Sequence, residues 1–84
     1  MHIQVLGPGC AKCKKLETMT RDALSAEGVE ATVEKVTDIM EISKLGVFAT
    51  PALIIDGQIV ATGSLPSKGA IAKWILQKKG QSLA

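Results

Sequence analysis

The sequence contains two cysteines, Cys10 and Cys13, which are separated by Ala11 and Lys12. Side chains three positions apart are neighbours on one helical turn, so these two sulfurs can come close enough to bond. A dithiol of this kind can carry two electrons as a disulfide that forms and breaks. The same spacing is also found in half of a zinc site, in a soft-metal site or in two incidental thiols, so the motif alone leaves these alternatives open.

The surroundings of the two cysteines favour a reactive thiolate. Gly7-Pro8-Gly9 stands directly before Cys10, and a helical pattern starts directly after it. At the start of a helix, unpaired backbone N–H groups and the helix dipole favour negative charge on a sulfur. Positive charge nearby comes from Lys12, Lys14 and Lys15. Thiols in such settings have pKa values lowered from ~8.5 to ~3.5–7.5. We therefore expect Cys10 to act first as the nucleophile and Cys13, one turn inside the helix, to be less exposed and to act second.

The elements before and after the motif alternate between strand and helix. The apolar run His2–Leu6 predicts a central strand buried on both faces. Residues Ala11–Glu27 predict a helix that ends at Gly28, with an apolar face made of Leu16, Met19, Ala23 and Ala26. Val29–Val36 alternates apolar and polar residues, which predicts a half-buried strand near the edge of a sheet. The order strand, helix, strand predicts a right-handed parallel unit.

The second half of the chain predicts a short helix, a hairpin and a final helix. Thr37 or Asp38 can cap a helix over 39–45 that ends at Gly46. Asp56-Gly57 separates the apolar run 52–55 from the run 58–62, and this pair predicts a hairpin because both turn positions need positive φ. The last helix is expected to follow Ser67, to stop at Gly80, and to bury the stripe Ala70, Ile71, Trp74 and Ile75.

Composition limits the functions that the chain can have. Its 84 residues and 46% hydrophobic content predict one folded domain over 1–84. The net charge of +2 and the absence of a basic run interleaved with aromatics argue against nucleic acid as a partner. No apolar stretch approaches the ~20 residues that span a bilayer, and the N-terminus does not resemble a signal peptide. We expect a cytoplasmic monomer with no membrane partner, and in a reducing compartment a paired motif is more often catalytic or metal-binding than structural.

The whole pattern resembles the thioredoxin-like family. Two motifs carry the resemblance: Cys10-Ala11-Lys12-Cys13 at the first strand-to-helix junction, and Thr50-Pro51 directly before the hairpin. The chain is most similar to the small, glutaredoxin-sized group called redox-active disulfide proteins. The resemblance implies an α/β protein with the minimal thioredoxin fold, in the order βαβαββα, with a mixed four-stranded sheet flanked by three helices.

The resemblance also implies an activity and a set of site residues. The expected activity is that of a thiol–disulfide oxidoreductase in which Cys10 is the nucleophile and Cys13 resolves the mixed disulfide. Pro51 is expected to be cis and to face the dithiol, so that Thr50 and Pro51 bind an extended protein substrate by strand addition. Lys12 and Gly9 are expected to modulate the dithiol. No cofactor is expected apart from the redox-active disulfide itself. The expected partners are disulfide-containing proteins and an unidentified reductase.

The sequence departs from thioredoxin and glutaredoxin at informative positions. Gly9 and the dipeptide Ala11-Lys12 stand where thioredoxin has tryptophan and Gly-Pro. Gln4 stands where thioredoxin carries a buried aspartate, and an amide cannot take the proton of Cys13. Water or Lys12 can take that role instead. The chain has no tyrosine, a residue that glutaredoxins commonly use in their dipeptide, so use of glutathione is not indicated.

Two other functions compete with the redox interpretation. A metallochaperone would hold a soft ion such as Cu(I) between Cys10 and Cys13. Such domains commonly carry methionine before the first cysteine and follow the order βαββαβ, whereas this chain has Gly7-Pro8-Gly9 there and ends in a helix. A structural zinc needs four ligands, and His2 is the only histidine. A catalytically idle interaction domain is the third alternative.

Overall fold

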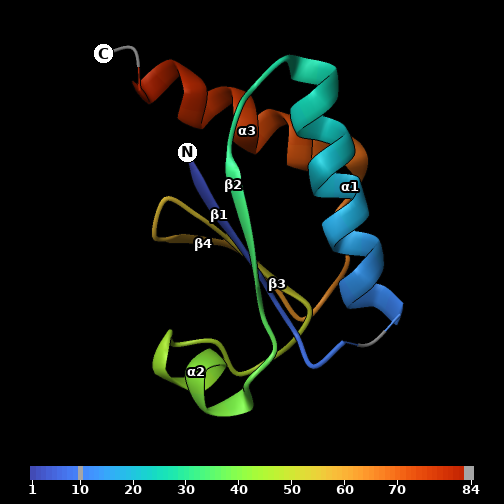
Figure 1. Ribbon diagram of the computed structural model, residues 1–84, viewed down its shortest axis with the longest axis vertical. Coiled ribbons are helices and arrows are strands. Elements are labelled where there is room, and N and C mark those ends of the chain that lie inside the picture. Colours follow the sequence, from blue (N-terminus) through green and yellow to red (C-terminus); the bar gives the residue numbers. More distant parts are fainter. Residues whose placement is uncertain (10, 83–84) are drawn as a thin grey trace.

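The computed structural model describes residues 1–9 and 11–82, which form seven elements in the order βαβαββα (Figure 1). The helices and strands are β1 (His2–Leu6), α1 (Ala11–Glu27), β2 (Thr32–Val36), α2 (Ile39–Lys44), β3 (Ala52–Ile55), β4 (Gln58–Thr62) and α3 (Lys68–Ser82). The architecture is the minimal thioredoxin fold, as the sequence predicts. No helix within the described residues is long and apolar enough to cross a membrane.

The four strands form one mixed sheet in the order β2-β1-β3-β4. β1 pairs with β2 in parallel and with β3 antiparallel, so it occupies a central position. β3 and β4 form the antiparallel hairpin, and its turn residues Asp56 and Gly57 both have positive φ, 48° and 82°. The predicted hairpin turn is confirmed.

The sheet separates two apolar clusters, because successive side chains of a strand point to opposite faces. The larger cluster lies under α1 and α3 and contains Ile3, Val5, Leu16, Leu24, Leu53, Ile55, Ile71 and Ile75, with Trp74 packed against it. The smaller cluster lies under α2 and contains Leu6, Ile42, Val47, Ala52 and Ile54. In Figure 1, α1 and α3 lie together beside the sheet, whereas α2 lies at the end of the molecule away from the C-terminus. α2 therefore covers only part of its face of the sheet.

The buried stripe of α1 differs from the predicted one. It consists of Cys13, Leu16, Thr20 and Leu24, whereas Met19 and Ala23 are half-buried and Ala26 is exposed. The prediction missed Thr20 because a hydroxyl counts as polar, but this side chain donates to the Leu16 carbonyl at 2.8 Å and so satisfies its own hydrogen bond. The stripe begins at Cys13, and the packing of α1 therefore buries this sulfur.

Three predicted boundaries are wrong by one to three residues. β2 begins at Thr32 rather than Val29, because the Val29 N–H donates to the Leu24 carbonyl and closes the end of α1. α2 ends at Lys44, with Leu45 as its C-cap and Asp38 as its N-cap. α3 continues through Gly80 to Ser82, since glycine within a helix costs only ~0.5–1 kcal/mol and does not by itself end one.

Candidate active site

Cys13 is the third residue of α1, and its side chain is 5% exposed. It takes part in a disulfide. Cys10, the other cysteine of the sequence and the predicted nucleophile, lies outside the described residues. The structure thus describes the second of the two predicted redox cysteines, in its oxidised form and in the sheltered position expected for it.

The Cys13 sulfur packs directly against Gly7. A methyl group on Gly7 would overlap Cys13 Sγ, and it would lie 3.0 Å from Cys13 Cβ and 3.9 Å from Thr50 Cβ. The Gly7 N–H donates to the Val36 carbonyl at 2.9 Å, which fixes this residue to the end of β2. A side chain at position 7 is therefore excluded by the close approach of the sulfur.

The Thr50–Pro51 peptide bond is cis, which confirms the prediction. Pro51 is buried at the start of β3, and its carbonyl accepts a hydrogen bond from the Gly63 N–H at 3.0 Å. Thr50 is half-buried and lies near Gly7, on which the Cys13 sulfur also rests. Gly7 and Cys13, at the junction of β1 and α1, thus meet Thr50, which comes from a segment far along the chain.

The two predicted modulating residues are at the surface. Gly9 is exposed and has a φ of 93°, a value that side chains rarely adopt. Lys12 is exposed in the first turn of α1, as are Lys14 and Lys15, and this turn contains no acidic residue. The start of α1 therefore carries positive charge in addition to its own dipole.

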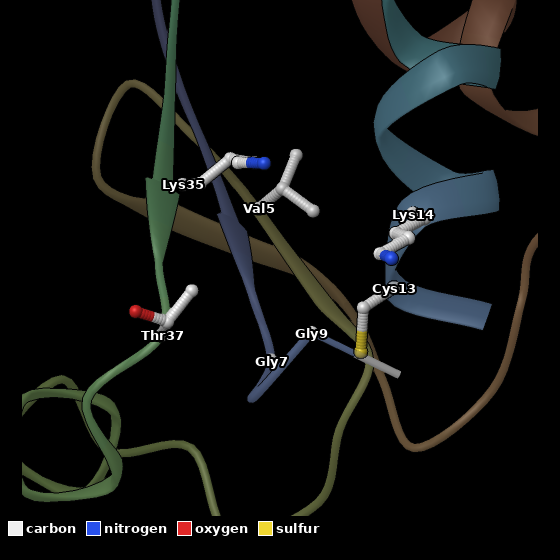
Figure 2. Close-up of a pocket in the computed structure, with 7 residues that line it drawn as sticks. All are labelled: Val5, Gly7, Gly9, Cys13, Lys14, Lys35 and Thr37. Atoms are coloured by element: carbon white, nitrogen blue, oxygen red, sulfur yellow. The ribbon is translucent and has the colours of Figure 1, made fainter. Parts of the chain in front are cut away.

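A small hollow of about 40 Å³ lies beside the Cys13 sulfur (Figure 2). Its lining consists of Val5, Gly7, Gly9, Cys13, Lys14, Lys35 and Thr37. Gln4 is on the opposite face of the sheet, where its Nε2 donates to Glu34 Oε1 at 3.2 Å. The strand residue that faces Cys13 is therefore Val5, and the polar side chains that line the hollow are Lys14 of α1, Lys35 of β2 and Thr37, which follows β2. Sequence reasoning missed Lys35 and Thr37, because only the register of β2 against β1 brings them here.

An exposed apolar surface borders the other side of the site. Phe48 is 87% exposed, and Ile39 and Met40 of α2 are 69% and 68% exposed. A groove beside these side chains is lined by Pro8, Ile39, Ile42, Ser43, Val47, Phe48 and Thr50. The signal for this surface in the sequence is the short apolar run directly before Thr50-Pro51, to which the motifs assign no function.

The described residues contain no group of three or more histidine, cysteine, aspartate or glutamate side chains that could hold a metal ion.

The fold, the disulfide at the start of α1 and the cis-proline beside it together define a redox protein of the thioredoxin class. Comparison with known proteins agrees. The model of the family described as "Thioredoxin domain" matches residues 1–76, and the chain belongs to this family. Its activity is accordingly that of a thiol–disulfide oxidoreductase.

Two archaeal proteins, both called thioredoxin, are similar to this chain. The one from Methanothermobacter thermautotrophicus is 38% identical over 73 residues, which are 87% of this chain and 95% of the relative. The one from Methanocaldococcus jannaschii is 38% identical over 65 residues, which are 77% of this chain and 74% of the relative. Both matches cover most of each chain, so the similarity extends well beyond the dithiol motif.

Proposed function

We propose that this protein reduces disulfides in protein substrates with the Cys10-Ala11-Lys12-Cys13 dithiol. The observation that carries the proposal is the position of the disulfide-bonded Cys13 sulfur, packed on Gly7 near Thr50 of the cis Thr50–Pro51 bond. A dithiol at this point is next to backbone that an extended substrate can approach. Residues 1–84 act in this proposal as a single thioredoxin-like domain.

The reaction proceeds by two exchanges. The Cys10 thiolate attacks one sulfur of the substrate disulfide, a mixed disulfide forms, and the first substrate thiolate leaves. The Cys13 sulfur then attacks Cys10, which forms the Cys10–Cys13 bond and releases the second substrate thiolate. The two electrons that reduce the substrate come from the dithiol, so no bound cofactor is required, and a reductase of the cell must return the protein to the dithiol form.

Thr50 and Pro51 bind the substrate in this proposal, and Lys12 and Gly9 modulate the dithiol. Thr50 lies near Gly7 and the Cys13 sulfur, and in this proposal its backbone pairs with an extended substrate segment as an added strand. Lys12 adds positive charge next to Cys10, and Gly9 allows the loop to turn into α1. The proposed compartment is the cytoplasm, where thiols are kept reduced and a dithiol of this kind is ready to react.

Thiol titration in graded redox buffers, with a chelator present, tests the proposed function. We expect one two-electron transition between Cys10 and Cys13, with a midpoint between ~−270 and ~−120 mV, the range spanned by thioredoxin-like proteins. A midpoint near the lower value fits a reductant and one near the upper value an oxidant. Two thiols that never form a disulfide, or a stoichiometric bound metal that protects them from oxidation, would instead indicate that the protein carries a metal.

Phe48 is expected to contribute to the binding of protein substrates. Aromatic side chains are enriched among the residues that carry binding energy, and this one is almost fully exposed beside the groove that Thr50 also lines. Phe48→Ala should raise KM for a disulfide-bonded test protein such as insulin by roughly fivefold or more, with kcat little changed.

The matched control is Leu76→Ala, which removes an exposed apolar side chain from α3. This variant, and the reaction of Phe48→Ala with a small aromatic disulfide, should both keep wild-type kinetics. An unchanged KM for the protein substrate in Phe48→Ala would remove Phe48 from the binding surface.

A further inference from the structure

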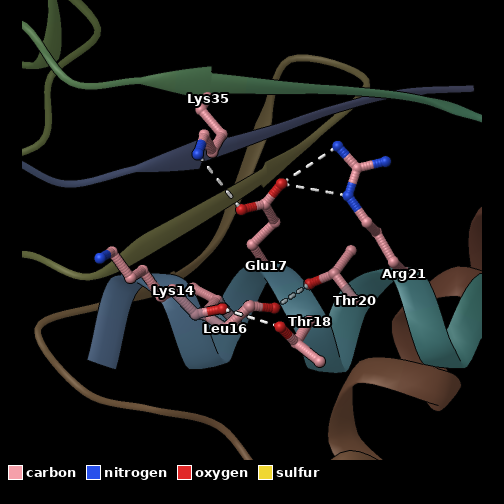
Figure 3. A network of polar contacts seen from close by, with 7 residues as sticks. All are labelled: Lys14, Leu16, Glu17, Thr18, Thr20, Arg21 and Lys35. Carbon is pink, nitrogen blue, oxygen red and sulfur yellow. Dashed lines mark hydrogen bonds and ion pairs between the residues drawn. The ribbon is translucent and has the colours of Figure 1, made fainter. Parts of the chain in front are cut away.

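The two sides of the site are held by different contacts. α1, which carries Cys13, is joined to β2 by the ion pair of Glu17 Oε1 and Lys35 Nζ, which are 3.5 Å apart (Figure 3). Thr50, on the other side of the site, lies in the bend that precedes β3 rather than in a helix or a strand. Contacts made by its neighbours in the chain therefore help to set where Thr50 lies relative to the Cys13 sulfur.

One residue, Gly63, contacts both neighbours of Thr50. It directly follows β4, and its N–H donates to the Pro51 carbonyl at 3.0 Å. This bond continues the antiparallel pairing of β3 and β4, which lie side by side in the sheet (Figure 1), by one residue pair. On the other side of Thr50, the Ala49 side chain comes so close that a Cβ added to Gly63 would lie 3.2 Å from Ala49 Cβ. Through Gly63, the hairpin thus fixes the chain both before and after Thr50.

Position 63 favours glycine for two reasons. Its φ is 78°, a value that side chains rarely adopt. A side chain would also press on Ala49, because 3.2 Å is shorter than the ~3.5–4.0 Å at which carbon atoms pack best. Ala49 is exposed, so it would give way by moving outward, and Thr50 is the next residue in the chain. The absence of a side chain at Gly63 is therefore linked to the position of Thr50.

We propose that Gly63 is a positioning residue for protein substrates: it fixes the chain on both sides of Thr50, so that the Thr50 backbone can pair with a substrate segment beside the Cys13 sulfur. The inference rests on the proposed function, in which an extended substrate is added as a strand. Thr50 lies on the side of the site where the sulfur packs, since its Cβ is 3.9 Å from a Cβ added to Gly7. A displaced Thr50 would misalign the substrate backbone with the sulfur.

Single-turnover oxidation of the reduced full chain by insulin and by dithiobis(nitrobenzoate) tests this role. Insulin presents its disulfides on a backbone, whereas the aromatic reagent presents a disulfide alone. Gly63→Ala should lower the second-order rate constant with insulin by about fivefold, the size of effect expected when one backbone hydrogen bond to the substrate is poorly aligned. Its rate constant with the aromatic disulfide should equal that of the wild type.

The matched control is Gly57→Ala. Gly57 lies in the turn of the same hairpin and has a similar φ of 82°, but a Cβ added there meets nothing within 4 Å. This variant carries comparable backbone strain and should keep the wild-type rate with insulin. Gly63→Asn separates the two effects of a substitution at position 63, because asparagine adopts positive φ more readily than alanine. It retains the added Cβ and should react with insulin as slowly as Gly63→Ala.

A double-mutant cycle with Ala49 tests the contact itself. Ala49→Gly removes the methyl group that a Cβ at position 63 would meet. In the Gly63→Ala background it should therefore restore most of the lost rate with insulin. Additive effects of the two changes, a fivefold loss in Gly57→Ala, or a wild-type insulin rate in Gly63→Ala would each overturn the inference.

The same measurements keep the two proposals apart. If neither disulfide oxidises the wild type to the Cys10–Cys13 form, the proposed function itself fails. If the wild type reacts with both disulfides and Gly63→Ala reacts with both at wild-type rates, only the positioning role of Gly63 fails. Urea unfolding of each variant shows that the rates refer to folded protein, and Gly63→Asn carries the test if Gly63→Ala is too unstable.

Discussion

Cys13→Ser is expected to stop the reaction at the mixed disulfide. Serine at position 13 leaves the predicted nucleophile Cys10 in place but removes the sulfur that resolves the intermediate. Incubation with a disulfide-bonded protein should then accumulate a stoichiometric covalent complex. Catalytic turnover should fall to the rate of the uncatalysed exchange. Non-reducing electrophoresis and intact mass spectrometry measure the complex, and a dithiol reductant should release the substrate from it.

Cys10→Ser is the matched control for this experiment. It removes the same number of thiols, but the remaining Cys13 thiol is sheltered at 5% exposure by Gly7 and the packing of α1. This variant should form no complex with the protein substrate. Equal trapping by the two variants would contradict the assignment of Cys10 as the nucleophile and Cys13 as the resolving cysteine.

Gly7→Ala is expected to destabilise the protein and to disfavour the disulfide. The added methyl would overlap Cys13 Sγ and lie 3.0 Å from Cys13 Cβ, and the Gly7 backbone is tied to β2 by its hydrogen bond to the Val36 carbonyl. Overpacking of this kind costs ~1–3 kcal/mol. Because total stability for a domain of this size is roughly 4–13 kcal/mol, the loss should be plain in urea unfolding of the oxidised protein.

Gly7→Ala should lower the free energy of unfolding more in the oxidised form than in the reduced form. A free Cys13 thiol can turn away from the methyl, whereas a sulfur held in a disulfide cannot. The midpoint potential should therefore rise, since the form that is disfavoured is the disulfide. Unfolding curves for both redox forms and a redox titration measure the two effects.

Gly69→Ala is the control for a glycine that no neighbour approaches. A methyl at this position in α3 meets nothing within 4 Å, and the residue has no positive φ. This change should leave the potential unchanged and raise stability by up to about 1 kcal/mol, because alanine is the better helix former. If Gly7→Ala behaved like Gly69→Ala, the close packing of the sulfur on Gly7 would not exist in solution.

Local signals in the sequence account for most of the secondary structure. β1, α1, β3 and β4 have the predicted bounds, and the hairpin turn has the predicted positive φ at Asp56 and Gly57. These features depend on residues close together in the chain: an apolar run, an apolar face at helical spacing that ends at a glycine, and a turn pair. The boundary errors at Val29 and Gly80 occur where a neighbouring helix could either end or continue at small cost.

The residues that surround Cys13 were harder to predict from the sequence. Lys35, Thr37 and Thr50 reach the site from segments more than twenty positions away, through the pairing of β1 with β2 and the cis bond at Pro51. Gln4, which the comparison with thioredoxin placed next to the dithiol, points to the opposite face because the strand alternates its side chains. Nothing in the spacing of one segment specifies which residue of another segment it will face.

The sequence was enough to predict that Cys13 lies at the start of a helix after a central strand, in a βαβαββα chain with Thr50-Pro51 before the hairpin. These properties follow from local periodicity and turn chemistry. The three-dimensional structure was needed to show that Cys13 packs on Gly7, that Val5 rather than Gln4 faces it, and that Lys35, which lines the hollow, pairs with Glu17. The physical reason is that sheet register and the packing of α1 against β2 bring together residues that are distant in the chain.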